Sequence, residues 1–393
     1  MRILHVVHRI PPSVGGSQQY AYRLAVEQAK LGHAVTIATT SSIHPTDDVP
    51  GLSVTGLHWR ATNADAPAHE RRDGIEIYRF RPRALVFTWL STPPLATWLR
   101  QHVTDYDAVH THGYTFAEPY YAVRARGRRR GPRLVLSGLD LTQPHASPLF
   151  RAMMWLYDHT HGRRILAGHD RFIALTRDNA RDYQRLGVPA SRIEVIPVGI
   201  NPNEFAWPPA KKPKALRLLC VGRLVAYKGF QSAIAAMPKL LQSEPRATLA
   251  IVGQDQGYAA SLKAQATALG VERSVEFLGS LPLDRLVAEF RRAHYFVFPS
   301  INEGFGIVVL EAIAAGCYPL LATVKSLRHL LREIGGSPVR ISSLAAGARD
   351  IARVVTTRSN AERVRAVQGM QTTVAERYAW PAVARQVLAT YHR

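Results

Sequence analysis

Short apolar strands alternate with amphipathic helices along most of this 393-residue chain. The first forty residues show the repeating unit. Residues 2–7 (RILHVV) read as a buried strand, residues 18–31 carry apolar side chains at helical spacing, and residues 33–40 (HAVTIATT) form a second strand. Further short strands are predicted at residues 75–80, 108–113, 133–138 and 170–176. This alternation predicts a parallel sheet with helices on both faces.

The pattern stops in the proline-rich residues 195–215 and then resumes, which is typical of a linker between two domains. Five more strands, each but the last followed by a helical stretch, are predicted at residues 216–222, 247–253, 274–279, 294–300 and 318–323. The fold class is therefore α/β. We expect two Rossmann-like, doubly wound domains that face a central cleft, with their boundary near residue 200.

The second domain begins with a strand whose following loop carries two cations. Gly222 allows a tight turn directly after the strand, and Arg223 and Lys228 follow within the loop. Ligands of open α/β sheets bind beyond the carboxyl ends of the strands, so both cations stand where one anionic group of a ligand would lie. The alternative is that they are two solvated loop cations.

The stretch 299–316 (PSINEGFGIVVLEAIAAG) places two carboxylates eight residues apart, Glu303 on a loop and Glu311 in an apolar helix. Gly304, Phe305, Gly306 and Ile307 lead into this helix, where backbone N–H groups can approach a ligand closely. A buried carboxylate needs donors. For Glu311 they are either Lys228 or Arg223, or the vicinal hydroxyls of a ligand, while Glu303 suits a second polyol.

The first domain offers weaker signals at its own strand ends. Gly15 and Gly16 lie between strand and helix, but the run is not GxGxxG and lacks the acidic residue of a dinucleotide site. His110 and His112 end one strand, where we expect one of them to face the cleft. No third ligand is apparent in the sequence, so hydrogen bonding is favoured over a metal site. Ser137 and Asp140 follow the next strand.

Composition and charge narrow the function classes further. The two cysteines, Cys220 and Cys317, form no disulfide framework and no CxxC pattern, and no run reads as a signal peptide or membrane span. A cytoplasmic protein is expected. The formal net charge of +21 favours anionic partners, yet no nucleic-acid-binding motif is present, so nucleic acid is not an expected partner.

Taken together, these motifs resemble glycosyltransferase family 4, the retaining enzymes of GT-B fold. They occur in the family's order over nearly the whole chain: the Gly15–Gly16 loop, the HxH strand end, the VGRLxxxKG loop, the E-x7-E of Glu303 and Glu311, and the terminal Tyr378 and Trp380. The E-x7-E within PSxxEGFGxxxLEAxAxG is the most specific. The resemblance implies an acceptor-side domain at 1–200, a donor-binding domain at 201–375, and a last helix, 376–393, that packs back on the first domain.

By the same resemblance, the substrate is a nucleotide-diphosphate sugar, and the sugar is transferred with retention to a glycan or lipid-linked acceptor without a metal or other cofactor. Arg223 and Lys228 would hold the diphosphate, Glu311 the ribose and Glu303 the donor sugar, with the Gly15–Gly16 loop closing over the phosphate. A bacterial polysaccharide or glycolipid pathway is expected.

The sequence departs from the family pattern twice. The family's H-G-x-D after the fourth strand is here Ser137-Gly138-Leu139-Asp140, so the histidine that contacts the donor sugar is missing. His112 or Ser137 is the candidate to replace it. The family's Gly-Gly-x-x-Glu is replaced by VKSLRHLLREIGG, residues 324–336, at the donor end. Both changes concern the sugar side of the site.

Two other functions remain as alternatives. One is a nucleotide-sugar 2-epimerase of the same fold, and the other is a non-catalytic basic protein that binds a membrane or nucleic acid. Six arginines between residues 124 and 133, together with the aromatic segment 147–164, predict peripheral attachment to the inner face of an anionic membrane. A solvated arginine face and a buried aromatic helix are the opposing interpretations.

Overall fold

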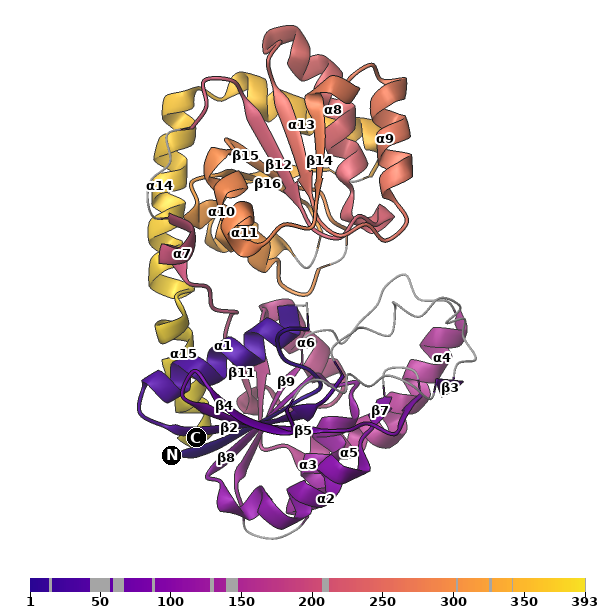
Figure 1. Cartoon of the computed structure of the whole chain (residues 1–393), viewed down its shortest axis with the longest axis vertical. Helices are drawn as coiled ribbons and strands as arrows, with labels where there is room; N and C mark the ends of the chain where they lie inside the picture. The colour runs from indigo at the N-terminus through magenta and orange to yellow at the C-terminus, as the bar shows by residue number, and fades with distance from the viewer. Residues whose placement is uncertain are drawn as a thin grey trace. The chain divides into compact units, whose positions relative to one another are not determined.

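The chain folds into two compact units, shown in Figure 1. The computed structural model describes residues 1–13, 16–42, 57–58, 67–86, 89–127, 131–138, 148–206, 212–301, 303–324, 327–340 and 342–392. Unit 1 comprises Met1–Gly199 and Trp380–Arg393, and unit 2 comprises Ile200–Ala379. The division falls inside the proline-rich segment, and the last helix belongs to unit 1.

Unit 1 is built on an eight-stranded sheet in the order β11-β10-β9-β8-β1-β2-β5-β4. Its strands are β1 (Arg2–Val7), β2 (Ala34–Thr40), β4 (His69–Arg72), β5 (Ile75–Phe80), β8 (Ala108–His112), β9 (Arg133–Gly138), β10 (Arg171–Ala174) and β11 (Ile193–Val195). All neighbours are parallel except β4, which pairs antiparallel with β5. The chain winds outward from β1 in one direction and from β8 in the other, so the switch point lies between these two strands.

Helices cover both faces of this sheet, as the alternation predicts. They are α1 (Gly16–Lys30), α2 (Pro93–His102), α3 (Ala117–Arg126), α4 (Pro148–Tyr157), α5 (Arg163–Gly168), α6 (Arg177–Arg185) and α15 (Trp380–His392), with short turns η2 (Val103–Asp105), η3 (Asp158–Gly162) and η4 (Ala190–Arg192). The central strands are buried along nearly their whole length, because parallel strands have helices on both sides. Helix α15 packs against α1.

Unit 2 repeats the plan with a six-stranded, all-parallel sheet in the order β14-β13-β12-β15-β16-β17. Its strands are β12 (Arg217–Val221), β13 (Thr248–Val252), β14 (Val275–Gly279), β15 (Tyr295–Phe298), β16 (Tyr318–Ala322) and β17 (Ser337–Val339). The winding reverses between β12 and β15. The two doubly wound sheets expected from the sequence are therefore confirmed.

The helices of unit 2 are α7 (Pro202–Ala206), α8 (Phe230–Ser243), α9 (Ala259–Ala268), α10 (Leu283–Arg292), α11 (Ile307–Ala314), α12 (Arg328–Glu333), α13 (Leu344–Thr357) and α14 (Asn360–Arg377), with turns η5 (Ala226–Lys228) and η6 (Glu272–Ser274). Helix α11 starts after Gly306 and ends as expected. Gly316 has φ +86°, and the N–H of Cys317 bonds the carbonyl of Ala312, which closes the helix end.

Some elements were not anticipated. The antiparallel edge strand β4 and a small antiparallel sheet of β3 (Leu57–His58), β6 (Ala84–Val86) and β7 (Trp89–Ser91) have no clear signal in the sequence. Strands of two or three residues are too short to show a period of two. Within the part of the chain that the structure describes, no helix is both long and apolar enough to cross a bilayer.

Candidate functional site

The carboxyl edge of the unit 2 sheet brings the loops after β12 and β15 together at the switch point. Gly222 and Gly253, each directly after its strand, cross so closely that a Cβ on Gly253 would lie 1.8 Å from the carbonyl oxygen of Gly222. The Gly222 N–H donates to the carbonyl of Val252 at 2.9 Å. Only glycine allows this approach, so the loop that carries Arg223 is held tightly against the sheet.

A second glycine joins the two loops. Gly229 has φ +74°, and a Cβ there would lie 2.3 Å from the carbonyl oxygen of Pro299. The N–H of Ile301 also donates to the carbonyl of Tyr227 at 2.9 Å. The segment 226–229 is thereby fixed to the start of the segment that carries Glu303.

This packing places Lys228 against Glu303. The Lys228 Nζ donates to Glu303 Oε1 at 2.5 Å, and both side chains are only 12% exposed. The ammonium group also lies 5.3 Å from the centre of the Phe298 ring. The structure thus unites two of the residues selected from the sequence in one largely desolvated ion pair.

Arg223 is exposed and lies on the same loop. Its guanidinium donates to the Tyr227 hydroxyl at 2.8 Å and to Gln256 Oε1 at 3.3 Å. Neither partner is charged, so the positive charge of Arg223 is not neutralised by these contacts. Arg223 can therefore bind an anion while its orientation is kept by neutral groups.

The loop from Gly304 to Ile307 forms the N-terminus of α11. Gly306 has φ +90°, and no side chain caps the first N–H groups of the helix among the described residues. Gly304 is exposed, whereas the Phe305 ring is buried against His329 (4.7 Å between ring centres) and Tyr378 (6.2 Å). Phe305 therefore supports the loop, while uncapped N–H groups remain available to an anion.

Glu311 lies in the second turn of α11 and is partly exposed rather than fully enclosed. Lys228 pairs with Glu303 and Arg223 with neutral groups, and among the described residues no donor contacts the Glu311 carboxylate. Desolvation, followed by the negative charge of Glu204, raises the pKa of Glu311 to about 7. The sequence left two sources of donors for Glu311, which are the cations Lys228 and Arg223 or the hydroxyls of a ligand. In the described structure neither cation donates to it.

The expected residues of unit 1 are less completely placed. Gly16 is the exposed first residue of α1, whereas Gly15 and Asp140 lie outside the described residues. Ser137 is fully buried at the end of β9, and its Oγ accepts a hydrogen bond from His110 Nε2 at 2.6 Å. The hydroxyl at the position of the missing family histidine is thus engaged inside the sheet.

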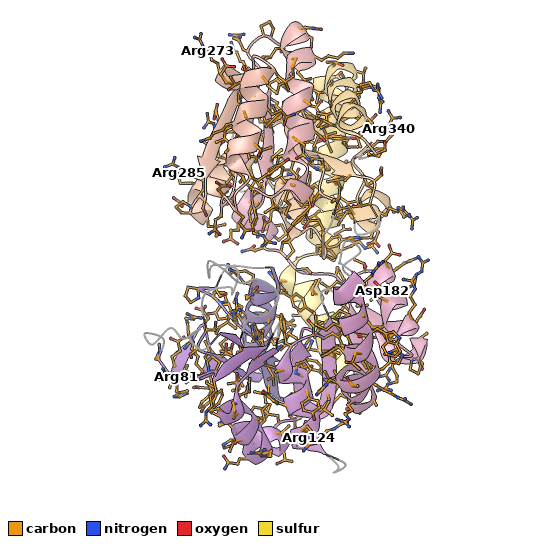
Figure 2. All side chains as sticks on the ribbon, turned by 90° about the vertical axis from the view of Figure 1, so that its right-hand side faces the viewer. Arg81, Arg124, Asp182, Arg273, Arg285 and Arg340 are labelled. Carbon is orange, nitrogen blue, oxygen red and sulfur yellow. The ribbon has the colours of Figure 1, made fainter. Side chains whose placement is uncertain are left out.

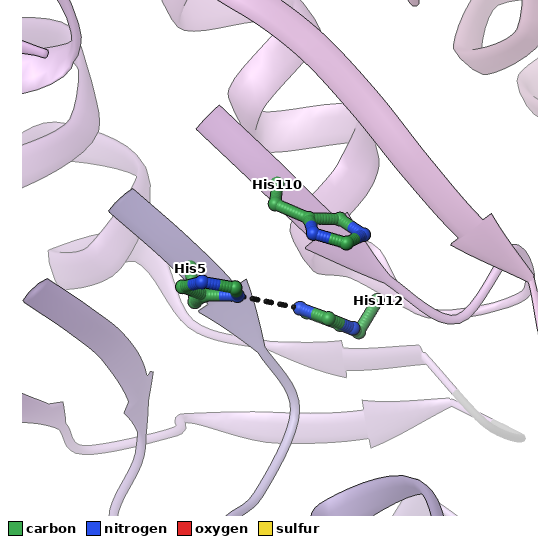
Figure 3. A group of neighbouring side chains, drawn as sticks. All are labelled: His5, His110 and His112. Atoms are coloured by element: carbon green, nitrogen blue, oxygen red, sulfur yellow. Dashed lines mark hydrogen bonds between the residues drawn. The ribbon is translucent and has the colours of Figure 1, made fainter. Parts of the chain in front are cut away.

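His110 and His112 both lie on one face of the sheet and are both buried, which differs from the expectation that one of them turns to the cleft. Residues two apart in a strand share a face. His5 on β1 pairs in register with His110, so three imidazoles gather in Figure 3. His5 Nδ1 and His112 Nε2 are 3.0 Å apart, and the rings of His110 and His112 stack at 4.3 Å.

The partners of these rings fix their tautomers. His5 Nε2 donates to Gln28 Oε1 at 2.8 Å, so a neutral His5 accepts at Nδ1 and His112 donates from Nε2. Gln28 also donates to the Tyr391 hydroxyl, which donates to His110 Nδ1 at 2.8 Å. Burial lowers the pKa of His5 to about 4 and holds the pKa values of His110 and His112 well below the usual value, in keeping with neutral rings.

The histidine cluster bears on whether a metal could bind here, because the sequence showed no third ligand beside His110 and His112. His5 supplies one, and one nitrogen from each ring lies within 4.8 Å of the others. However, His5 and His110 use both ring nitrogens in hydrogen bonds, and only Nδ1 of His112 has no partner among the described residues. A cation would have to replace several of these bonds with no carboxylate in the group. The donor set fits a hydrogen-bonded network that joins α1 and α15 to the sheet.

Sequence reasoning missed the residues that support the site. Tyr227, Gln256 and Phe298 orient the two cations, and Gly253 packs on Gly222. Gly253 had a signal, because it follows a predicted strand as Gly222 does. Gln256 and Phe298 could not be assigned from sequence, since the cations that they contact, Arg223 and Lys228, are 33 and 70 residues away along the chain.

Comparisons with known proteins cover nearly the whole chain. Residues 14–204 match the model described as Glycosyltransferase Family 4, and residues 203–366 match that described as Glycosyl transferases group 1. The chain is 28% identical to the GDP-mannose:cellobiosyl-diphosphopolyprenol alpha-mannosyltransferase of Xanthomonas oryzae pv. oryzae, over all of this chain and 97% of that protein. It is 30% identical to the D-inositol 3-phosphate glycosyltransferase of Nocardia farcinica, over 81% of this chain and 72% of the relative.

The fold is also that of a solved structure. Anabaena Alr3699/HepE, determined in complex with UDP and glucose, superposes with a TM-score of 0.72 at 18% identity, covering 100% of this chain and 99% of the other.

Proposed function

The chain belongs to glycosyltransferase family 4 and has the GT-B fold, and from this premise we propose that it transfers a sugar, with retention, from a nucleotide-diphosphate sugar to a lipid-linked or glycan acceptor. The observation that carries the proposal is the Lys228–Glu303 ion pair at the switch point of unit 2, beside Arg223 and the uncapped N-terminus of α11. This arrangement combines positive groups for a diphosphate with a carboxylate for sugar hydroxyls.

In the proposed mechanism, the diphosphate lies between Arg223, Lys228 and the first N–H groups of α11. The bond between the anomeric carbon and the phosphate oxygen breaks, and the electron pair leaves with the nucleoside diphosphate. The acceptor oxygen then bonds the same face of the sugar and gives its proton to the leaving phosphate. Arg223 and Lys228 stabilise the negative charge that develops on the leaving group, which is where electrostatic catalysis acts.

Glu303 and Glu311 bind the two ends of the donor. Glu303, held by Lys228, accepts hydrogen bonds from the donor sugar, and Glu311, which lacks a donor from the described residues, accepts them from the ribose hydroxyls. His112 does not serve as a contact to the sugar in this proposal, because its ring is buried and bonded to His5. The Gly15–Gly16 loop remains the proposed cover of the phosphate.

We propose that no metal or other cofactor takes part, since two cationic side chains and a helix N-terminus supply the positive charge. Activity should therefore survive EDTA. Complete loss of activity in EDTA, restored by Mg²⁺ or Mn²⁺, would show that the charge is supplied by a cation instead.

We propose a lipid-linked acceptor at the inner face of a bacterial membrane, in polysaccharide or glycolipid synthesis. The support is the Xanthomonas oryzae relative, whose name gives a diphosphopolyprenol-linked acceptor and GDP-mannose as donor. Cytoplasmic location and peripheral attachment to the membrane are parts of the same proposal.

A donor screen tests the proposed function directly. UDP-, GDP- and ADP-sugars, with GDP-mannose first, are compared by the rise in melting temperature that a ligand of the folded state produces. The ligand with the largest shift is then incubated with the enzyme, and release of nucleoside diphosphate and transfer of labelled sugar are followed. No shift with any nucleotide sugar would refute the donor site. Conversion to an epimer without transfer would assign the epimerase activity.

A further inference from the structure

A basic hollow of about 1000 Å³ opens in unit 1, away from the edge where the family binds its substrates. Its wall includes Arg124, Arg126, Arg133, Arg164, Gly168 and Asp170. Helices α3 and α5 end here, and strands β9 and β10 begin here. The hollow therefore lies at the amino edge of the sheet, opposite the carboxyl edge.

Four arginines and one aspartate give this hollow an excess of positive charge. Arg126 is fully engaged, with Asp170 Oδ2 at 2.5 Å and the carbonyl of Gly168 at 2.6 Å. Within the described part of the chain, the guanidinium groups of Arg124, Arg133 and Arg164 form no hydrogen bond or ion pair. Three arginines with no carboxylate partner in that part of the chain thus surround one concave surface.

A purely structural role accounts for only part of this charge. Cations are favourable near the C-termini of α3 and α5, and Arg126 has this role through Gly168. Arg133 belongs to neither helix, since it is the first residue of β9. Since like charges around one hollow repel each other, a bound anion would stabilise this arrangement.

An exposed face of the neighbouring helical run adds an apolar component. Along α4, η3 and α5, exposed side chains recur every three or four residues and include Arg151, Trp155, Leu156, His159, Arg163 and Arg164. Trp155 is 62% exposed and Leu156 58%. Large apolar side chains beside arginines are typical of helices that lie at a membrane interface.

We propose that the hollow binds the phosphate of an anionic phospholipid headgroup, while Trp155 and Leu156 insert into the interface beside it. The hollow supplies the charge and the helical run supplies the apolar anchor, which a free phosphate would not need. This proposal rests on the proposed function in one respect, because membrane binding would bring the enzyme to a lipid-linked acceptor. Binding itself requires neither donor nor catalysis.

Vesicle flotation with matched variants tests the proposal in the full chain. Arg124, Arg133 and Arg164 are changed together to glutamine, and the control changes Arg273, Arg285 and Arg349, three arginines of unit 2, in the same way (Figure 2 labels Arg124, Arg273 and Arg285). Phosphatidylcholine vesicles are compared with vesicles that also contain phosphatidylglycerol. Each arginine near such a surface contributes roughly a fivefold effect, so the hollow variant should bind on the order of 100-fold more weakly.

The control variant should retain most of its binding, although it loses the same charge. Binding of the unchanged chain should need phosphatidylglycerol and fall with salt. W155S/L156S should bind more weakly at a salt concentration where charge is screened. The region of Arg128, Arg129 and Arg130, which lies outside the described residues, is left unchanged in these variants.

Three results would overturn the proposal: equal binding to both vesicle types, equal losses in the hollow and control variants, or a short RNA that binds as tightly and loses as much in the hollow variant. The temperature shift with a nucleotide sugar provides the independent check. A hollow variant that keeps this shift is folded and retains its donor site, so failure of membrane binding and failure of the proposed function are separated.

Discussion

Glu311 is the residue at which burial and charge oppose each other most clearly. Its pKa of about 7 means that the free protein holds this carboxyl about half protonated at neutral pH. Ribose hydroxyls are bound best by the charged carboxylate. Nucleotide-sugar affinity should therefore rise by up to about tenfold between pH 6 and pH 8. Calorimetry should use the intact nucleotide sugar as the ligand. The free terminal phosphate of a nucleoside diphosphate would itself titrate near pH 6 and would add its own pH dependence.

The variant Glu311→Gln separates the effect of this charge on the stability of the free protein from its effect on donor binding. It should weaken donor binding at pH 8 by roughly 2–3 kcal/mol and remove the pH dependence. The folded pKa is raised, so the stability contribution is present below the unfolded value near 4.5 and is lost as pH rises through 7. The free variant should therefore be more stable than the parent at pH 8, by about 1–3 kcal/mol, and nearly equal to it at pH 4, below the unfolded pKa. An unchanged donor Kd in this variant would show that Glu311 does not bind the ribose hydroxyls.

Lys228 and Arg223 differ in how the protein holds them, and their variants should differ accordingly. Both Lys228→Ala and Arg223→Ala should lower kcat/KM by about 10²–10³-fold, as expected when a group that stabilises developing charge is lost. Lys228→Ala should also lower the melting temperature, because it leaves Glu303 without its partner, whereas Arg223 is exposed.

The double variant Lys228→Met with Glu303→Gln is the control for this pairing. It should recover most of the stability lost in Lys228→Ala, but not the activity. Wild-type kcat/KM in both single variants would contradict the proposed mechanism, and an additive loss of stability in the double variant would contradict the ion pair.

At the scale of the elements, glycines allow the close backbone contacts that position the loops of the site. Gly229 should be sensitive to substitution, because the Cβ of an alanine there would meet the Pro299 carbonyl in addition to the strain of φ +74°. Gly257→Ala is the matched control, since it has φ +87° but nothing within 4 Å of a Cβ. The control should cost about 1–2 kcal/mol of stability. Gly229→Ala should cost more and should also weaken donor binding, which thermal unfolding and calorimetry can measure. Equal effects would show that the contact with Pro299 does not matter.

Elements with a strong local signal were predictable from sequence, and those that depend on distant partners were not. Helix α11 starts and ends within two residues of its expected limits, because Gly306 and Gly316 punctuate an apolar run. Which of the two carboxylates pairs with Lys228 could not be inferred, since the position of Lys228 relative to them depends on packing between the loops after β12 and β15. Sequence placed all three residues at one edge, but only the structure pairs Lys228 with Glu303.

At the scale of the whole molecule, the alternation of strands and helices was sufficient to predict two doubly wound sheets. It could not predict which strands lie side by side, and the strand order therefore brings together residues that no local pattern connects. The network of His5, His110, Ser137 and Tyr391 shows why. Its members come from β1, β8, β9 and α15, and the contact between Gln28 and Tyr391 spans 363 residues. No local pattern encodes such a contact. The same network consumes the Ser137 hydroxyl, which the sequence left as a candidate for sugar contact.

This network also predicts that the two units respond differently to acid. Burial lowers the pKa of His5 and His169 to about 4, and those of His110 and His112 lie well below 6.5, so the unfolded chain binds more protons than unit 1 does as pH falls. Stability from these four histidines is present above pH 6.5 and is lost between about pH 6.5 and 4. Unit 2 has only His294 lowered in this way among its described residues, and Glu311 acts in the opposite direction. Hydrogen exchange of the full chain, corrected for the intrinsic rate at each pH, should show β1, β8 and β9 losing protection more steeply than β12 and β13 between pH 7 and pH 5. Equal losses in both units would mean that the buried histidines do not govern acid stability.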